Sequence, residues 1–298
     1  MSDNLVQEII SQIPSWESVR EIKIDPLEGL TNTNYKVTVD GEGFVLRIAG
    51  ENSARLGIDR QLEYEALLAA ANAGIGPQVL HCILPQGHLV TRYINGRHWT
   101  LAEYRQRVNL RRIVETVQRL HALPPVRATF SPFRRVEAFV EQVQTLGVSL
   151  PADFDTFLQR MSLIESQQAE DDYPWQRFCH NDLFSVNVLD DGELHFIDWE
   201  FSGVGDIYFD LATLSYAYDS VDTLSPELQQ YLLACYFGTV SEKNYIRLEG
   251  MKYMLMFFSA MWGMLQYGMQ RSGLVRFVEG FDFMEYAEVT FQAMRSMF

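Results

Sequence analysis

The residues best suited to chemistry in this sequence are three oxygen-bearing side chains within residues 178–212. Asp182 precedes a short apolar strand, Asn187 lies at its start, and Asp198 follows a second strand after the turn at 190–192. Two strands joined by a tight turn form a hairpin, so we expect the three side chains at one end of a small sheet. An aspartate that accepts a hydroxyl proton, together with Asn and Asp oxygens that hold magnesium against phosphate, is what phosphoryl transfer requires.

The spacing of these residues is that of a known motif. His180-x-Asp182 followed by Asn187 has the spacing of the protein-kinase catalytic loop, and Asp198 corresponds to its metal-binding aspartate. Here Asp198 is followed by Trp-Glu instead of Phe-Gly, and Gly-Asp and Phe-Asp-Leu-Ala strings follow downstream. This variant resembles the aminoglycoside phosphotransferase and choline kinase superfamily. The resemblance implies ATP as co-substrate, Mg²⁺ as cofactor, Asp182 as catalytic base, and Asn187 and Asp198 as metal ligands.

Two further residues are expected to support this site without touching the substrate. The superfamily counterpart of Asp210 braces the catalytic loop by hydrogen bonds, and a place at a helix start also fits this residue. His180 is expected to do similar structural work beside Asp182. His121, which lies on an apolar helical stripe, is expected to be a packed histidine and not a ligand.

Composition limits the classes of partner. The chain has 298 residues, of which 47% are hydrophobic and 21% charged, as in an ordinary globular protein. Its net charge of −15 makes nucleic acid an unexpected partner, because affinity for nucleic acid comes mainly from basic groups. An acidic surface favours a small cationic substrate by steering, although solubility alone also explains such a charge.

The sequence predicts a cytoplasmic location. Cys82, Cys179 and Cys235 are odd in number and too scattered for a disulfide framework or a zinc site, which fits a reducing compartment. The first residues have neither a basic region nor a long apolar core, so we expect no signal peptide. The most apolar run, 253–265, is too short to span a bilayer and predicts a buried helix.

Hydrophobic patterning predicts an α+β, two-lobed, protein-kinase-like fold. Residues 1–93 would form a small N-terminal lobe with an antiparallel sheet and one main helix, and residues 94–298 a larger, mostly α-helical C-terminal lobe. Strands are expected at 19–24, 34–39, 44–48, 79–84 and 88–93, and helices at 5–13, 59–73, about 110–120, 135–146, 152–165, 226–237, 242–269 and 280–297.

The segment 27–35 lies where a kinase fold has its phosphate-covering loop. It lacks the Gly-x-Gly-x-x-Gly pattern, but Gly29 permits close approach of backbone, and Thr31 and Asn32 supply side-chain donors to phosphate. The string Gly-Leu-Thr-Asn-x-Asn-Tyr resembles the corresponding loop of choline kinases. Further along, the hinge at Tyr93 and Ile94 would meet adenine through its backbone.

An ion pair is expected to complete the nucleotide site. Arg47 occupies the strand position of the protein-kinase lysine, and an arginine there can bind phosphate oxygens bidentately. The choline kinase branch is similar in carrying Arg here. Either Glu63 or Glu65, on the following helix, should pair with Arg47 as the helix glutamate of kinases does. Counting back from the Gly-Pro that resembles the family's Leu-Gly-Pro makes Glu63 the better match.

The acceptor is expected to bind near the C-terminus. Residues 257–266 and 283–287 resemble the end of choline kinases, in which aromatic residues at the positions of Trp262 and Tyr286 face the trimethylammonium group. An aromatic wall attracts such a cation through the ring quadrupole. The sequence departs from the family at Ser259, where choline kinases tend to carry a second tryptophan. Further residues expected to add to the wall or its charge are Trp199, Tyr216, Tyr218, Tyr267 and Glu200.

Three functions remain open from the sequence. The first is a choline or ethanolamine kinase, whose partners are ATP and a small cationic alcohol. The second is a kinase of the same fold for another alcohol, such as thiamine, an aminoglycoside or a sugar. The third is an inactive nucleotide-binding scaffold, which the presence of Asp182, Asn187 and Asp198 disfavours. The sequence leaves open the acceptor, the choice between ATP and GTP, and the oligomeric state.

Overall fold

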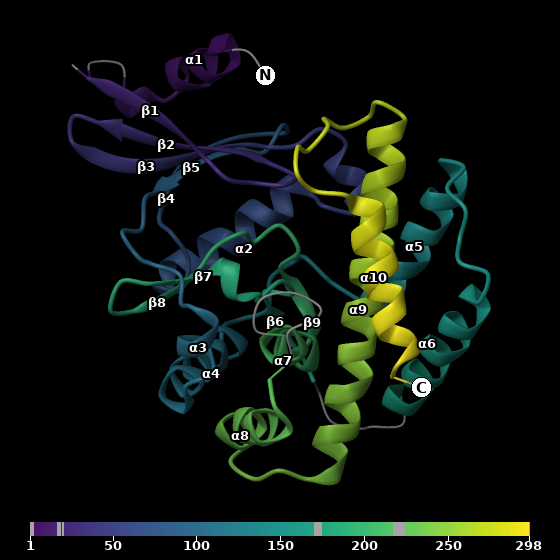
Figure 1. Cartoon of the computed structure of the whole chain (residues 1–298). Helices are drawn as coiled ribbons and strands as arrows, with labels where there is room; N and C mark the ends of the chain where they lie inside the picture. Colours follow the sequence, from purple (N-terminus) through teal and green to yellow (C-terminus); the bar gives the residue numbers. More distant parts are fainter. Residues whose placement is uncertain (1–2, 17–18, 20, 170–174, 217–223, 298) are drawn as a thin grey trace.

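The computed structural model describes residues 3–16, 19, 21–169, 175–216 and 224–297 (Figure 1). Its N-terminal part is a five-stranded antiparallel sheet with the order β1-β2-β3-β5-β4. The β2–β3 hairpin turns at Asp40-Gly41, both with positive φ, as the sequence predicts. The strands are β1 (Ile22–Leu27), β2 (Thr33–Val39), β3 (Glu42–Ile48), β4 (Val79–Ile83) and β5 (His88–Arg92).

The first strand differs from its predicted bounds. We expected it at 19–24, but β1 runs to Leu27 and includes Pro26. Proline removes a ladder donor and is tolerated at a sheet edge, and β1 is the edge strand beside β2. β1 also begins at Ile22, three residues later than predicted.

Helices cover the two faces of the sheet. On one face, Ile9 of α1 (Asp3–Ser11) and Trp16 of the 3₁₀ turn η1 (Pro14–Trp16) belong to one buried cluster with Val37 and Leu46 of the sheet. On the other face, α2 (Arg60–Asn72) buries its apolar side in a larger core that continues through the rest of the chain. Asp59 caps α2 by accepting from the amides of residues 61 and 62.

The remainder is mostly helical, which confirms the predicted fold class. The long helix α9 runs through the core, with 253–261 buried throughout, and α10 packs alongside it (Figure 1). None of the helices in the described ranges is long and apolar enough to cross a membrane. The helices are α3 (Leu101–Tyr104), α4 (Arg107–His121), α5 (Pro132–Thr145), α6 (Phe154–Ala169), α7 (Ile207–Ser215), α8 (Pro226–Phe237), α9 (Glu242–Arg271) and α10 (Phe283–Arg295), with the short η2 (Ser53–Leu56) before α2.

Two small antiparallel pairs lie between these helices. The predicted hairpin is formed by β7 (Val188–Asp190) and β8 (Leu194–Phe196). The second pair, β6 (Gln176–Cys179) with β9 (Gly203–Asp206), was not predicted. Each of its strands has four residues and β9 contains two glycines, so neither carries the alternation that marks a strand.

Candidate active site

Asp182, Asn187 and Asp198 lie together at one end of the β7–β8 hairpin. Asn187 ends the 3₁₀ turn η3 (Ser185–Asn187), and its Nδ2 donates to both Oδ2 and the backbone oxygen of Asp182, each at 2.8 Å. The amide of Ile197 donates to the backbone oxygen of Asn187 at 3.0 Å, which places Asp198 beside the other two. Asp198 itself has a left-handed backbone, with φ 65°.

The electrostatics of this cluster favour a bound cation. Burial, reinforced by the charge of Glu200, raises the pKa of Asp182 to about 7. Burial and the nearby Glu200 and Asp182 likewise raise the pKa of Asp198 well above its ordinary value. Within the described residues, Asp198 Oδ1 is buried without a hydrogen-bond partner. An orphaned carboxylate oxygen beside the carboxamide of Asn187 is a donor set that suits Mg²⁺, so the residues fit the expected metal.

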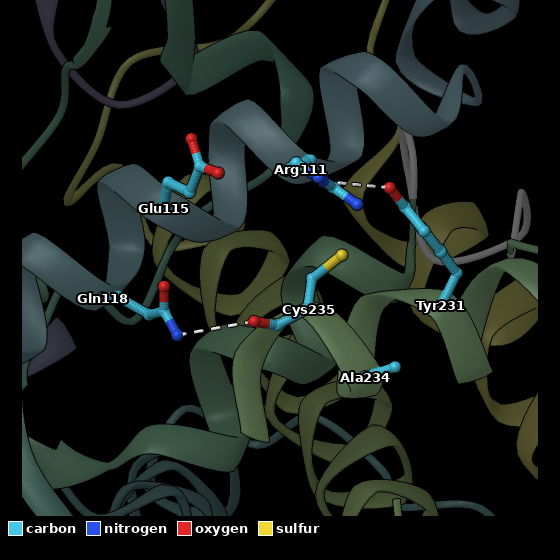
Figure 2. Close-up of a pocket in the computed structure, with 6 residues that line it drawn as sticks. All are labelled: Arg111, Glu115, Gln118, Tyr231, Ala234 and Cys235. Atoms are coloured by element: carbon cyan, nitrogen blue, oxygen red, sulfur yellow. Dashed lines mark hydrogen bonds between the residues drawn. The ribbon is translucent and has the colours of Figure 1, made fainter. Parts of the chain in front are cut away.

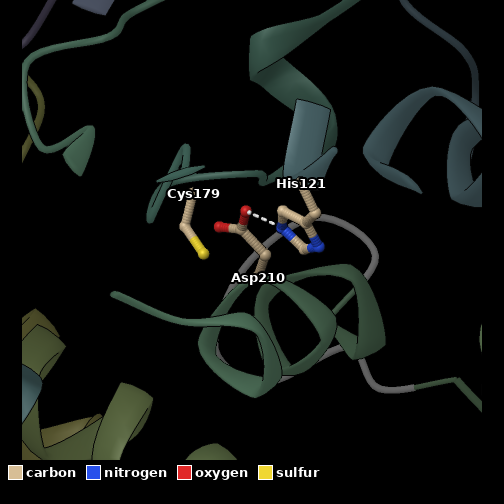
Figure 3. Close-up of side chains that lie close together, drawn as sticks. All are labelled: His121, Cys179 and Asp210. Carbon is tan, nitrogen blue, oxygen red and sulfur yellow. Dashed lines mark hydrogen bonds and ion pairs between the residues drawn. The ribbon is translucent and has the colours of Figure 1, made fainter. Parts of the chain in front are cut away.

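Asp210 anchors the loop that carries Asp182. It lies in the first turn of α7 and is fully buried, and its carboxylate accepts from the amides of His180 at 2.9 Å and Asn181 at 2.6 Å. His121 from α4 also contacts Asp210, with 3.0 Å between Nε2 and Oδ2 (Figure 3). The position agrees with the bracing role expected for Asp210, and His121 is packed, as expected.

Three neighbouring side chains, those of His121, Cys179 and Asp210, could be taken for a metal site. Cys179 lies beside His121 and Asp210 (Figure 3). However, Asp210 already accepts hydrogen bonds on both oxygens, and Cys179 Sγ lies 3.4 Å from the oxygen of Gly205 as a donor. Burial also raises the pKa of the Cys179 thiol, which disfavours the thiolate that a metal needs. We therefore interpret this cluster as a structural brace.

His180 links the catalytic loop to the strand before Asp198. Its Nε2 lies 3.0 Å from the oxygen of Ile197, and its ring packs 4.6 Å from that of Trp199, centroid to centroid. Nε2 must be the donor in this bond, because a carbonyl oxygen only accepts. Burial lowers the pKa of His180 from 6.5 to about 4.

A pH dependence of stability follows from His180. The unfolded chain protonates this side chain below pH 6.5 and the folded protein only near pH 4, so acidification favours the unfolded state in between. We expect the free energy of unfolding to fall by roughly 3 kcal/mol from this group across that window. Urea unfolding at a series of pH values should show the loss in the wild type and a flatter profile in His180→Gln. Parallel profiles for the wild type and His180→Gln would contradict the assignment of this pH dependence to His180.

Arg47 pairs with Glu63 in a buried ion pair. Arg47 also donates to the oxygen of Gly87 at 3.2 Å. Burial by itself would raise the pKa of Glu63, but the charges of Arg47 and Arg60 hold it below its ordinary value. Glu65 points elsewhere and pairs with Arg127. The structure thus decides between the two glutamates that the sequence left open.

The two glutamates provide a matched test. Glu63→Ala leaves the buried guanidinium of Arg47 without its carboxylate and that of Arg60 with Glu200 alone, and we expect it to cost about 3–5 kcal/mol of unfolding free energy. Glu65→Ala removes a partly exposed pair that solvent screens, and it should cost much less than Glu63→Ala. Chemical unfolding of both variants measures the difference. Equal losses would contradict the pairing.

Arg60 is a residue of this network that the sequence analysis missed. Its Nη1 lies 2.7 Å from Glu63 Oε2 and 3.1 Å from Glu200 Oε2, so it bridges the start of α2 to the segment after Asp198. Asn32 Nδ2 donates to Glu200 at 3.0 Å, and Asn32 Oδ1 accepts from Arg60 at 3.3 Å. The sequence analysis placed Arg60 only within the predicted helix 59–73. The buried network consists of Asn32, Arg47, Arg60, Glu63 and Glu200.

This network changes the expected roles of Glu200 and Asn32. We expected Glu200 to add charge to the acceptor site, but the structure turns it toward Arg60, Asn32 and Thr31. The side chain of Asn32 is therefore occupied within the protein, with Oδ1 also accepting from the amide of Gly50 at 3.0 Å. The loop would then meet phosphate mainly through its backbone.

Two glycines make the shape of this loop possible. A Cβ on Gly29 would lie 2.8 Å from the oxygen of Asn32, and a Cβ on Gly50 would lie 2.3 Å from the oxygen of Thr31. Both approaches are shorter than real Cβ contacts, so side chains at these positions would displace the loop. The sequence analysis named Gly29 as a position that permits close approach of the backbone, but it did not single out Gly50.

The hinge residues follow β5. The amide of Tyr93 donates to the oxygen of Gly43 at 3.0 Å and is thus already used within the sheet. The amides and oxygens of Arg97 and Asp190 pair at 3.0 Å, which ties the end of the hinge to the catalytic hairpin. Between these two attachments Ile94 has no backbone partner in the described ranges, so its amide and carbonyl can meet adenine.

Trp262 and Tyr286 come together where α9 and α10 meet. Both are half-buried, and their ring centroids are 6.0 Å apart at 85°. Phe283 lies 5.5 Å from Trp262, and Phe281, which the sequence analysis did not single out, lies 5.6 Å from Tyr286. Gly263 permits this approach, since a Cβ there would lie 2.9 Å from the oxygen of Phe283.

Trp262 lies one helical turn beyond a contact between α9 and the segment that follows Asp198. Phe258, one turn before Trp262, packs its ring 5.5 Å from that of Phe201, which directly follows Glu200. Residues four apart share a helix face, so Trp262 points to the same side as Phe258. Trp262 therefore lies on the face of α9 that packs against Phe201 one turn earlier.

The other aromatic residues expected in this wall lie elsewhere. Trp199 is buried in the core, where Nε1 donates to the oxygen of Phe196 at 2.8 Å. Tyr216 is buried at the end of α7, with Lys252 Nζ 6.0 Å from its ring centroid. Tyr267 lines a separate groove of about 890 Å³ between α9, α10 and residues 147–153. Tyr218 lies outside the described residues.

A further small cavity of about 330 Å³ lies between α4 and α8, outside this cluster (Figure 2). Arg111 in its wall donates to the hydroxyl of Tyr231 at 3.2 Å, and Gln118 donates to the oxygen of Cys235 (Figure 2). Gln118 also donates to the oxygen of Tyr236 at 2.8 Å. Since Arg111 and Gln118 are already bonded within the protein, we assign this cavity no role.

A β-sheet lobe, a catalytic-loop Asp–Asn pair and a second aspartate after a hairpin define the class of kinase-like phosphotransferases. The model of the phosphotransferase enzyme family matches residues 23–245, so the chain belongs to that family. This confirms the resemblance and the class of enzyme predicted from the sequence.

Individual relatives make the similarity more specific. The chain is 31% identical over 221 residues to protein LicA of Haemophilus influenzae. This match covers 72% of this chain and 62% of LicA. A choline/ethanolamine kinase family protein from Mesorhizobium loti has 26% identity and a TM-score of 0.78, over 100% of this chain and 95% of that one. The structure of LicA in complex with AMP, at 19% identity and a TM-score of 0.74 over both whole chains, shows the same fold.

Proposed function

We propose that this protein is an ATP- and Mg²⁺-dependent kinase that phosphorylates the hydroxyl of choline or ethanolamine. The observation that carries the proposal is the convergence of Asp182, Asn187 and Asp198, joined by the 2.8 Å Asn187–Asp182 bonds and the Ile197–Asn187 backbone bond. The choline/ethanolamine kinase relative and LicA support the acceptor class. We further propose residues 1–93 and 94–298 as the two lobes.

Residues of the N-terminal part would hold the nucleotide. Adenine would meet the backbone of Ile94, and the phosphates would lie under residues 29–34, near the guanidinium of Arg47. Glu63 keeps Arg47 oriented through their buried ion pair. Asn187 and Asp198 would hold Mg²⁺, which supplies neutralisation of phosphate charge. The AMP complex of LicA, which has this fold, is consistent with a nucleotide in this place.

The chemical step is then direct transfer. The acceptor oxygen forms a bond to the γ-phosphorus while the bond between that phosphorus and the ADP oxygen breaks, and the hydroxyl proton passes to Asp182. The bond from Asn187 Nδ2 orients the Asp182 carboxylate, and Asp210 holds the loop beneath it. The raised pKa of Asp182 fits a group that must accept a proton.

The acceptor proposal rests on the half-buried Trp262–Tyr286 pair with Phe281 and Phe283 around it. Aromatic faces attract a quaternary ammonium without hydrogen bonds that it cannot make, by up to ~2 kcal/mol per desolvated contact. Ser259, where the family tends to have tryptophan, leaves one wall of the cage absent. That departure favours a second candidate, a kinase of the same fold for a larger cation such as thiamine.

An ADP-release assay with a panel of alcohols tests the proposal. We expect turnover with choline or ethanolamine and little with sugars or aminoglycosides. Trp262→Leu should raise the KM for choline by about 10–30-fold, the loss of one cation–π contact, while Trp262→Phe retains part of it. Tyr267→Leu, an aromatic change on the same helix that faces a different groove, is the matched control. No acceptor-stimulated ATP turnover with any alcohol would refute the proposal.

A further inference from the structure

The loop between α9 and α10 reaches across to the loop between β1 and β2 (Figure 1). Arg276 Nη2 donates to the backbone oxygens of Gly29 at 3.0 Å and of Asn32 at 3.2 Å. A second contact lies nearby, where Asn52 Nδ2 donates to the oxygen of Leu274 at 2.6 Å. The C-terminal lobe thus holds the proposed phosphate loop by its main chain.

The same connecting loop also forms part of the aromatic cluster. It begins after Arg271, the last residue of α9, and reaches Phe281, whose ring lies 5.6 Å from Tyr286 and 5.0 Å from Phe283. A single short segment, 272–282, therefore contacts the proposed acceptor site at one end and the proposed phosphate loop through Arg276.

The phosphate loop is held from two sides. On its buried side, Asn32 binds Glu200, Arg60 and Gly50 by its side chain. On its exposed side, Arg276 binds the loop oxygens and forms no ion pair within the described ranges. Since Arg276 has no carboxylate partner to bind, these two loop oxygens determine where its guanidinium lies. The contact forms only while the two loops are close to each other.

On the basis of the function proposed above, we propose that Arg276 is a positioning residue that couples the acceptor site to the phosphate loop. An acceptor between Trp262 and Tyr286 orders residues 272–282, and Arg276 then holds the loop 29–32 over the nucleotide phosphates. Thermodynamic linkage makes the effect reciprocal, so the nucleotide also tightens binding of the acceptor.

Calorimetric titration of Mg-ADP, with and without saturating choline, tests this coupling. We expect choline to tighten Mg-ADP binding to the wild type by about 5–30-fold, within the usual range of coupling between sites. Arg276→Ala should abolish the tightening, whereas Arg276→Lys, which keeps one charged donor, should retain part of it. In turnover assays Arg276→Ala should raise the KM for ATP far more than it lowers kcat.

Arg271→Ala is the matched control. Arg271 is an exposed arginine at the end of α9 that lines the groove between α9, α10 and residues 147–153. In the described structure it forms no hydrogen bond with residues 29–32. All variants should keep the wild-type unfolding midpoint, since Arg276 is exposed. Equal coupling in Arg276→Ala and wild type, or no coupling in an active wild type, would overturn the role of Arg276 and leave the kinase proposal standing. Absence of acceptor-dependent turnover in the wild type would instead overturn the proposed function.

Discussion

Replacing Asp182 with asparagine is expected to lower kcat by about 10²–10⁴-fold, the contribution of a positioned base. Asparagine has nearly the same shape, so its oxygen can still accept from Asn187 Nδ2, but it cannot take the acceptor's proton at neutral pH. Steady-state ADP release measures the loss. Mg-ADP binding should remain close to that of the wild type, because the change leaves Asn187 and Asp198 in place.

Glu193→Gln is the control for Asp182→Asn. Glu193 is an exposed acid at the turn of the same hairpin, and its removal changes the net charge equally without touching the cluster. It should leave kcat unchanged. Near-normal turnover of Asp182→Asn, or an equal loss in the control, would remove the support for Asp182 as base.

Asp198→Asn is expected to eliminate the magnesium-dependent part of nucleotide binding. Asparagine is chosen because it tolerates the left-handed φ of 65° at this position better than alanine does. The carboxylate is the group we propose as charged metal ligand, and its Oδ1 has no other partner among the described residues. Calorimetry with ADP, in the presence of Mg²⁺ and of EDTA, should show the same weak affinity in both conditions.

Although Asp198→Asn should weaken nucleotide binding, it should not lower the stability of the metal-free protein. The wild-type carboxylate is desolvated and repelled by Glu200 and Asp182, which raises its pKa and disfavours the folded charged form. Removing that charge is expected to leave the unfolding midpoint of the metal-free protein unchanged or higher, as at other functional sites where stability is sacrificed for activity. A clear drop in the midpoint, with metal-dependent binding retained, would show that Asp198 has a structural role instead.

Much of the architecture follows from local sequence signals. The bounds of α8 are those predicted from Ser-Pro-Glu, because a capping serine and proline at the first turn define a helix start without help from distant residues. A capping box forms at Thr100 and Glu103 for the same reason, because its two residues are only three positions apart. The spacing of Asp182 and Asn187 is equally local, since five residues separate two side chains that bond directly.

The placement of other residues depends on contacts between distant parts of the chain. Glu200 was expected beside the acceptor, and its actual partner Arg60 lies 140 residues away. Trp199 was expected in the acceptor wall but is buried beside His180. Neither outcome is readable from composition or periodicity, because a buried charge or aromatic ring takes whichever partner the packing of two lobes provides.

The sequence by itself thus determined the fold class, most helix and strand bounds, and the three residues proposed for phosphoryl transfer, because each depends on neighbours within a few residues. Only the tertiary structure decided that Glu63 and not Glu65 binds Arg47 and that Arg276 meets Gly29 from 247 residues away. The physical reason is that local hydrogen bonding and side-chain periodicity are encoded in short windows, whereas contacts between residues far apart in the sequence exist only after the chain has folded.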